Sequence, residues 1–156
     1  MNIIFLDIDG VLNSHRKLKE VYELTHKSHS GYNYPFDELC LANLTKIVVQ
    51  TNSKIVITST WRKDKEGRQK IIEALKEYNI DQHIIGYTPI LNQSRGNEIK
   101  AYLSTLDQTP NFIILDDDTD MEDLIDYLIK TNISDGLTKQ NTEEAILKLT
   151  KKRTSS

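Results

Sequence analysis

The sequence has little cysteine, glycine or proline and no long hydrophobic run, and each of these absences excludes a class of protein. Its single cysteine, Cys40, has no partner for a disulfide within the chain, so we expect a reducing compartment such as the cytoplasm. Six glycines and three prolines are too few for a collagen-like or low-complexity chain. No stretch approaches the roughly 18 apolar residues of a membrane-spanning helix, so we expect no membrane partner.

An excess of charge of one sign is also lacking. The 20 basic and 23 acidic residues leave a net charge of −3 at pH 7, which argues against a generic, strongly basic nucleic-acid binder. Hydrophobic residues make up 38% of the 156 residues, which suffices for an ordinary core. We therefore predict a single domain over residues 1–150, followed by a polar tail over residues 151–156, and leave the oligomeric state open.

Short apolar runs alternate with stretches in which apolar residues recur at helical spacing. The predicted strands are the runs at residues 3–6, 55–57, 84–85 and 112–115, with a fifth candidate at Ile133. The helical spacing occurs at residues 41–48, 71–78, 99–106, 124–128 and 145–149. Alternating strands and helices predict an α/β fold, a Rossmann-like three-layer α/β/α arrangement around a parallel sheet of about five strands.

Acidic residues follow two of the predicted strands, at the edge of a parallel sheet where ligands bind. Asp7 and Asp9 follow the first strand, and Asp116 and Asp117 follow the fourth. Two carboxylates in one site can divide the work, one attacking phosphorus as a nucleophile and the other moving protons. Crowded carboxylates repel one another unless a divalent cation neutralises them, and oxygen ligands suit Mg²⁺. The pattern predicts a Mg²⁺ site, with Asp120 as an alternative to Asp117 for its outer acid.

Hydroxyl and basic residues supply candidates for binding a phosphate. Thr58 and Ser59 end the second predicted strand, where hydroxyls and free backbone N–H groups can hold phosphate oxygens. Arg95 stands at the start of a predicted helix, and a cation there can neutralise a transferring phosphoryl group. Lys100, further along the same helix, is the alternative cation.

Together these residues resemble the motifs of the haloacid dehalogenase (HAD) superfamily of aspartyl phosphatases. Residues 7–11, Asp-Ile-Asp-Gly-Val, are similar to the first motif, and Thr58 and Arg95 are similar to the second and third. Asp116 and Asp117 are similar to the paired acids of the fourth motif. The resemblance covers nearly the whole chain and implies a HAD-like fold without a separate cap domain.

The resemblance also implies a role for each motif residue. Asp7 would be the nucleophile that forms an aspartyl-phosphate, and Asp9 would protonate the leaving group and later activate water. Thr58 and Arg95 would bind the phosphoryl group. Mg²⁺ would be held by the Asp7 carboxylate, the Asp9 backbone carbonyl and one of the two acids of the fourth motif.

A closer resemblance is carried by four segments of the chain, residues 5–13, 55–62, 95–99 and 115–118. They are similar to the HAD domains associated with RNA repair that are called Swiss Army Knife type. The phosphatase half of polynucleotide kinase–phosphatases is similar in outline. This resemblance implies a substrate with a phosphorylated nucleic-acid end.

Two further segments are open to a functional and to a structural interpretation. Residues 14–35 form a short insertion where the superfamily often inserts a cap, and they interleave basic and aromatic residues that could grip a nucleic-acid end. An ordinary polar loop is the alternative. Trp61 could stack on a base and Arg62 could bind a second phosphate, or Trp61 could fill the core while Arg62 pairs with an acid.

Our first hypothesis is a capless, Mg²⁺-dependent phosphohydrolase that acts on nucleic-acid ends or another large phosphorylated substrate. A phosphatase of small phosphomonoesters or nucleotides is one alternative, and a non-catalytic, phosphate-binding module of the same fold is another. A receiver-like phosphate sensor is disfavoured, because the third predicted strand ends in Ile85-Gly86-Tyr87 without the required aspartate.

Overall fold

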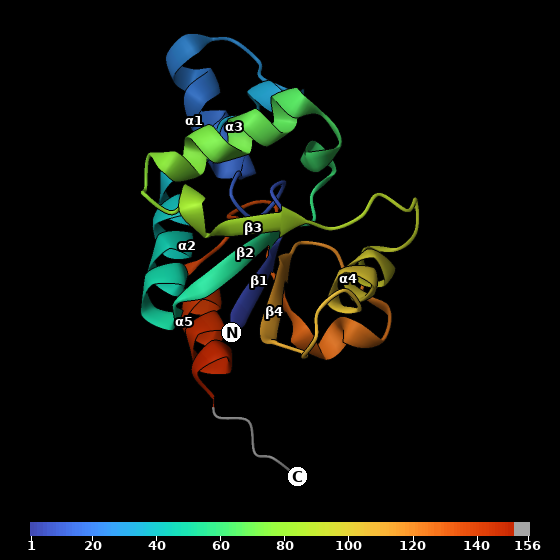
Figure 1. Cartoon of the computed structure of the whole chain (residues 1–156). Coiled ribbons are helices and arrows are strands. Elements are labelled where there is room, and N and C mark those ends of the chain that lie inside the picture. The colour runs from blue at the N-terminus through green and yellow to red at the C-terminus, as the bar shows by residue number, and fades with distance from the viewer. Residues whose placement is uncertain (152–156) are drawn as a thin grey trace.

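A parallel, five-stranded sheet forms the centre of the molecule (Figure 1). The computed structural model describes residues 1–151, so residues 152–156 of the predicted tail lie outside the described residues. The strands are β1 (Asn2–Leu6), β2 (Ser53–Ile57), β3 (Ile84–Tyr87), β4 (Asn111–Asp116) and β5 (Leu128–Lys130). They are ordered β3-β2-β1-β4-β5, and every neighbouring pair is parallel. The predicted α/β fold is therefore confirmed.

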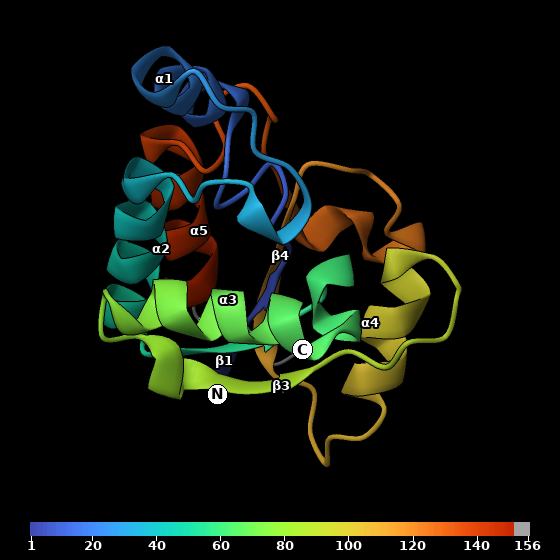
Figure 2. The same ribbon diagram turned by 90° about the horizontal axis from the view of Figure 1, so that it is seen from above.

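Helices cover both faces of this sheet. The α-helices are α1 (His15–Thr25), α2 (Glu38–Thr51), α3 (Lys65–Lys76), α4 (Arg95–Leu103) and α5 (Lys139–Thr150). Short 3₁₀-helices are η1 (Gly31–Asn33), η2 (Thr60–Lys63), η3 (Asp81–His83) and η4 (Glu122–Tyr127). Helices α2, α3 and α5 pack on one face, whereas α4 and η4 pack on the other (Figures 1 and 2). None of the helices among the described residues is long and apolar enough to cross a membrane.

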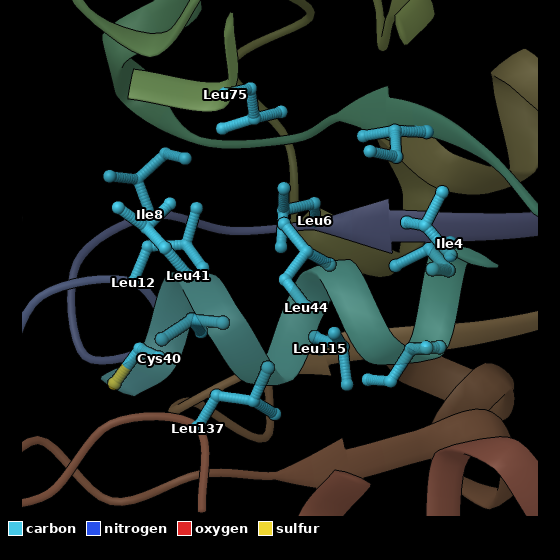
Figure 3. Close-up of a cluster of buried hydrophobic side chains, with 14 of the residues drawn as sticks. Ile4, Leu6, Ile8, Leu12, Cys40, Leu41, Leu44, Leu75, Leu115 and Leu137 are labelled. Carbon is cyan, nitrogen blue, oxygen red and sulfur yellow. The ribbon is translucent and has the colours of Figure 1, made fainter. Parts of the chain in front are cut away.

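The two faces of the sheet explain why the strands are apolar throughout. Along β1, Ile4 and Leu6 point into the core beneath α2, α3 and α5, while Ile3 and Phe5 point toward α4. Figure 3 shows Leu6 together with Leu44 of α2 in the larger of the two cores. Both of these leucines are completely buried. Strand β1 is thus the most protected element, and its carboxyl end is held firmly.

The last part of the sheet differs from the sequence prediction. The fifth strand is Leu128–Lys130 rather than a segment at Ile133, which lies beyond the strand and is 42% exposed. The helical spacing predicted over residues 124–128 gives only the short 3₁₀-helix η4, and Leu128 pairs with Ile114 of β4. The pair Leu128-Ile129 is too short for its spacing to distinguish a strand from a helix.

The insertion at residues 14–35 does not form a separate cap. It contains α1 and η1, and α1 has no buried residue. The backbone N–H groups of His15 and Arg16 donate to the carbonyl oxygens of Ile133 and Ser134 at 2.9 and 3.1 Å. Helix α1 consequently lies beyond the carboxyl ends of the strands (Figure 1).

The burial of Leu44 on α2 (Figure 3) predicts a clear difference in stability from a leucine on α5, a helix that covers the same face. Leu44→Ala should lower the free energy of unfolding by about 2–5 kcal/mol, because it leaves a cavity in the larger core. Leu147 of α5 is 69% exposed, so Leu147→Ala should change that energy by no more than about 0.5 kcal/mol. Urea denaturation of both variants measures this, and equal losses would contradict the assigned core.

Candidate active site

The acidic residues lie where the two central strands end. The backbone N–H of Asp7 donates to the carbonyl of Leu115 at 3.0 Å, so the ladder between β1 and β4 continues one residue past β1. Asp116 is the last residue of β4 and is 1% exposed. In the loop after β1, Gly10 has a φ of 78°, and a Cβ on this residue would lie 2.4 Å from Asp117 Oδ2. The loop after β1 therefore requires glycine at the point where it passes Asp117.

The loop after β1 is held by the segment that follows β5. Thr131 Oγ1 donates to the carbonyl of Gly10 at 2.6 Å, and the N–H of Leu137 donates to the carbonyl of Val11 at 2.9 Å. A Cβ on Gly136 would lie 2.6 Å from the Cys40 sulfur, so these segments are closely packed. Two segments far apart in the chain thus shape one loop.

Arg95 lies between the acids. Its Nη1 is 3.0 Å from Asp7 Oδ1 and 3.0 Å from Asp116 Oδ2, and it donates to Thr58 Oγ1 at 3.4 Å. Burial tends to lower the pKa of Arg95, but the negative charges of Asp7 and Asp116 outweigh it and the pKa is raised. One cation therefore reaches the ends of β1, β2 and β4. Lys100, the alternative, instead forms an ion pair with Asp123.

Helix α4 begins at Arg95, and its start is fixed by the loop after β4. The N–H groups of Arg95 and Gly96 donate to the side chain and the carbonyl of Asp120, at 3.2 and 2.9 Å. A Cβ on Gly96 would lie 2.2 Å from the carbonyl oxygen of Met121, so only glycine allows this approach. Asp120 therefore anchors the helix that carries Arg95.

Three carboxylates form a candidate cation site. Asp7, Asp116 and Asp117 each offer an oxygen, and these atoms lie within 4.8 Å of one another. Asp120 does not belong to this group. Burial and, after it, the nearby charge of Asp7 together raise the pKa of Asp116 to about 8, although Arg95 opposes both. The pKa of Asp117 is raised by the same two causes. Oxygen ligands that are costly to ionise without a counter-charge fit a hard divalent cation.

Thr58 and Ser59 are both buried at the end of β2. The N–H of Thr58 donates to the carbonyl of Leu6 at 2.9 Å, which places its hydroxyl beside Arg95. Ser59 caps η2, because its Oγ accepts from the N–H of Trp61 at 3.2 Å. The structure therefore brings Thr58 to the acidic group, while the Ser59 side chain serves the turn that follows.

The carboxylate of Asp9 is exposed, but two side chains orient it. The Asn13 side-chain amide donates to Asp9 Oδ1 at 2.8 Å, and the indole Nε1 of Trp61 donates to Asp9 Oδ2 at 3.2 Å. Asn13 also accepts from the N–H of Gly10 at 2.9 Å, which closes the loop on itself. Sequence reasoning missed Asn13, although asparagine side chains commonly hydrogen-bond to backbone groups a few residues away.

The surroundings of Trp61 and Arg62 match the structural interpretation of these residues, in which Trp61 fills the core and Arg62 pairs with an acid. Trp61 is 3% exposed and packs edge-on against Tyr32 and Phe36.

All five N–H groups of Arg62 are engaged in the described structure, and burial lowers its pKa. Their acceptors are the carbonyls of Thr58, Ser59, Thr88 and Pro89 and the Glu98 carboxylate. Arg62 thus ties the loop after β2 to α4, and none of its donors faces a second phosphate.

A parallel sheet in this order, with acids at the ends of β1 and β4, is that of a HAD-like α/β domain. A family model described as the HAD domain in Swiss Army Knife RNA repair proteins matches residues 3–142, and the chain belongs to this family. Comparisons with curated proteins and with solved structures gave no significant match.

The acidic group predicts how the stability of the metal-free protein depends on pH. An unfolded aspartate titrates near pH 4, whereas folded Asp116 has a pKa of about 8, so the folded state holds a proton that the unfolded chain releases between these values. The contribution of Asp116 is therefore complete below pH 4 and is lost as the pH rises toward 8. Melting temperatures at pH 5 to 8.5 should fall less steeply for Asp116→Asn than for the wild type.

Cation binding should raise the melting temperature at pH 8, because it supplies the missing counter-charge. Adding millimolar Mg²⁺ should stabilise the wild type in a saturable manner, whereas Asp117→Asn should lose most of this stabilisation. Asp118→Asn removes a neighbouring charge outside the group and should keep it. Equal shifts for the two variants would contradict the assigned cation site.

Proposed function

We propose that this domain is a Mg²⁺-dependent phosphohydrolase that acts through an aspartyl-phosphate on Asp7. The observation that carries the proposal is the position of Arg95, whose Nη1 lies 3.0 Å from both Asp7 and Asp116 and within reach of Thr58. A phosphoryl group next to Asp7 would meet the guanidinium and the Thr58 hydroxyl. Phosphoryl transfer needs mainly such positioning and charge neutralisation.

In the first step, an Asp7 carboxylate oxygen attacks phosphorus, and the bond from phosphorus to the leaving oxygen breaks. Asp9, as a carboxylic acid, gives its proton to that oxygen, so the leaving group departs as a neutral alcohol. A bound Mg²⁺, held by Asp7, the Asp9 carbonyl and Asp116 or Asp117, would neutralise charge on the phosphoryl oxygens. Arg95 and Thr58 orient the same group.

In the second step, Asp9 is a carboxylate and takes a proton from water. The water oxygen attacks phosphorus, and the bond to Asp7 breaks. Inorganic phosphate leaves, and both carboxyl groups return to their starting states. The hydrogen bonds from Asn13 and Trp61 hold Asp9 in one orientation through both proton transfers.

The proposed substrate is a phosphorylated nucleic-acid end. Membership of a family described for RNA repair proteins supports this, as does the lack of a cap domain, because an open site admits a large substrate. Small phosphomonoesters or nucleotides are the alternative substrate class.

The test compares the wild type with Asp7→Asn, which removes the nucleophile but keeps the shape of the side chain. Phosphate release from a generic aryl phosphate and from a 3′-phosphorylated oligonucleotide should require Mg²⁺ and stop in EDTA. The variant should lose at least about 1,000-fold in kcat. Asp118→Asn is the matched control, since it changes a nearby aspartate outside the proposed machinery. Full activity of Asp7→Asn would refute the mechanism, and inactivity of the wild type on both substrates would favour a binding module.

If Asp9 acts as the general acid and base, the two side chains that orient it, Trp61 and Asn13, should affect turnover although neither contacts the phosphoryl group. Trp61→Phe keeps an aromatic ring but removes the N–H that donates to Asp9, and Asn13→Leu removes the second donor. Each variant should lower kcat about 10-fold with little change in KM, because general acid–base catalysis contributes about 100- to 10,000-fold and only part of it is lost. Steady-state kinetics would contradict the role if KM alone changed.

A further inference from the structure

A cavity of about 490 Å³ opens beside Asp9, on the side of the insertion. Its lining includes the side chains of Asn13, Tyr32, Tyr34, Trp61 and Ile133. Pockets of this size hold small organic groups. Because η1 and the residues around it form one wall, the insertion contributes to the site without being a cap.

The lining is aromatic and nearly uncharged. Asp9 supplies its one carboxylate, and no lysine or arginine of the described residues lines it. Two basic residues of α1 are engaged elsewhere, since Arg16 pairs with Asp37 at 2.5 Å and Lys17 with Glu38 at 2.8 Å. The cavity therefore offers aromatic surface, mainly from the half-buried Tyr32 and Tyr34 because Trp61 is 3% exposed, together with hydroxyl or amide groups. Its lining offers no cationic partner for a second phosphate.

The hydroxyl of Tyr34 is buried and has no hydrogen-bond partner among the described residues. A buried polar atom without a partner is unfavourable, and such atoms are uncommon in folded proteins. Burial and the nearby charge of Asp9 raise the pKa of Tyr34, which keeps its proton in place. Tyr34 thus lines the cavity and carries a hydroxyl that no described residue satisfies.

We propose that this cavity is the leaving-group subsite and that it takes the uncharged, planar base of the nucleoside that carries the phosphate. The inference rests on the proposed function, in which Asp9 protonates the leaving oxygen, so the leaving group must lie against Asp9. The cavity is the space beside Asp9 that is lined by rings. Bases present a flat face to such rings and polar edges to groups such as the Tyr34 hydroxyl.

The experiment measures binding separately from turnover. Trp61 is the single tryptophan of the chain and lines the cavity, so its fluorescence reports a ligand that enters it. Asp7→Asn is titrated in Mg²⁺ with a trinucleotide that carries a 3′-phosphate on its last nucleoside, and with the same molecule lacking that last base. A second pair of trinucleotides carries the phosphate at the 5′ end, and one of the two lacks the base of that first nucleoside. Comparing the two pairs shows whether the site prefers a 3′- or a 5′-phosphorylated end.

For the 3′-phosphorylated or the 5′-phosphorylated pair, the trinucleotide that keeps its base should bind about tenfold or more tightly than the abasic trinucleotide. Tyr34→Leu in the same background should reduce this ratio to near one. Tyr22→Leu changes an exposed tyrosine of α1 outside the cavity and should leave the ratio unchanged. Equal affinities of the ligands with and without the base, or no binding of either, would overturn the subsite.

The failure of this inference can be told from failure of the proposed function. If aryl phosphate is hydrolysed but the ratio is one, the phosphatase stands and the base subsite falls. If no phosphate is released from any substrate but the ratio is high and depends on Tyr34, the cavity stands as a base-binding site and the hydrolytic function falls.

Discussion

Three carboxylates meet where two buried strands end, and their mutual repulsion is the constraint to which the rest of the site responds. Asp7 and Asp116 are almost fully buried, and neither can leave, because each belongs to a ladder of the central sheet. Arg95 supplies one counter-charge, at 3.0 Å from both. The pKa of Asp116 is raised mainly by burial and also by the charge of Asp7, and the charge of Arg95 only partly offsets these effects. Three carboxylates beside one guanidinium leave a negative charge that fits a metal ion.

The position of Arg95 in turn depends on groups that never touch the acids. Arg62 and Glu98 form an ion pair at 3.0 Å, and both are almost completely buried. Arg62 donates hydrogen bonds to backbone carbonyls of the loops after β2 and β3, while Glu98 lies on α4, the helix that begins at Arg95. A buried pair of this kind adds little stability on balance, but removing one partner leaves a costly unpaired charge. Its benefit here is geometrical, since it sets the approach of α4 to the sheet.

The sequence was informative where chemistry follows directly from a strand end. Asp7 and Asp116 could be assigned to one edge because the runs before them are continuously apolar, which is typical of central parallel strands. It was uninformative where one short pattern fits two structures, as with Leu128-Ile129 in β5. Contacts between residues far apart in the chain produce no recognisable pattern in the sequence. The hydrogen bond from the Trp61 indole to Asp9 and those from Arg62 to backbone carbonyls are examples. The two interpretations of Trp61 and Arg62 could be compared only in three dimensions.

The hydrogen bonds that join Gly10 to Thr131 and Val11 to Leu137 have a consequence for the order in which the molecule is made. The nucleophile candidate lies at residue 7, but its loop is completed by segments more than a hundred residues later in the chain. A ribosome must therefore have synthesised the chain as far as Leu137 before this loop can adopt its final shape. An amino-terminal fragment that ended before β5 would contain every acid of the group and still lack the scaffold that arranges them.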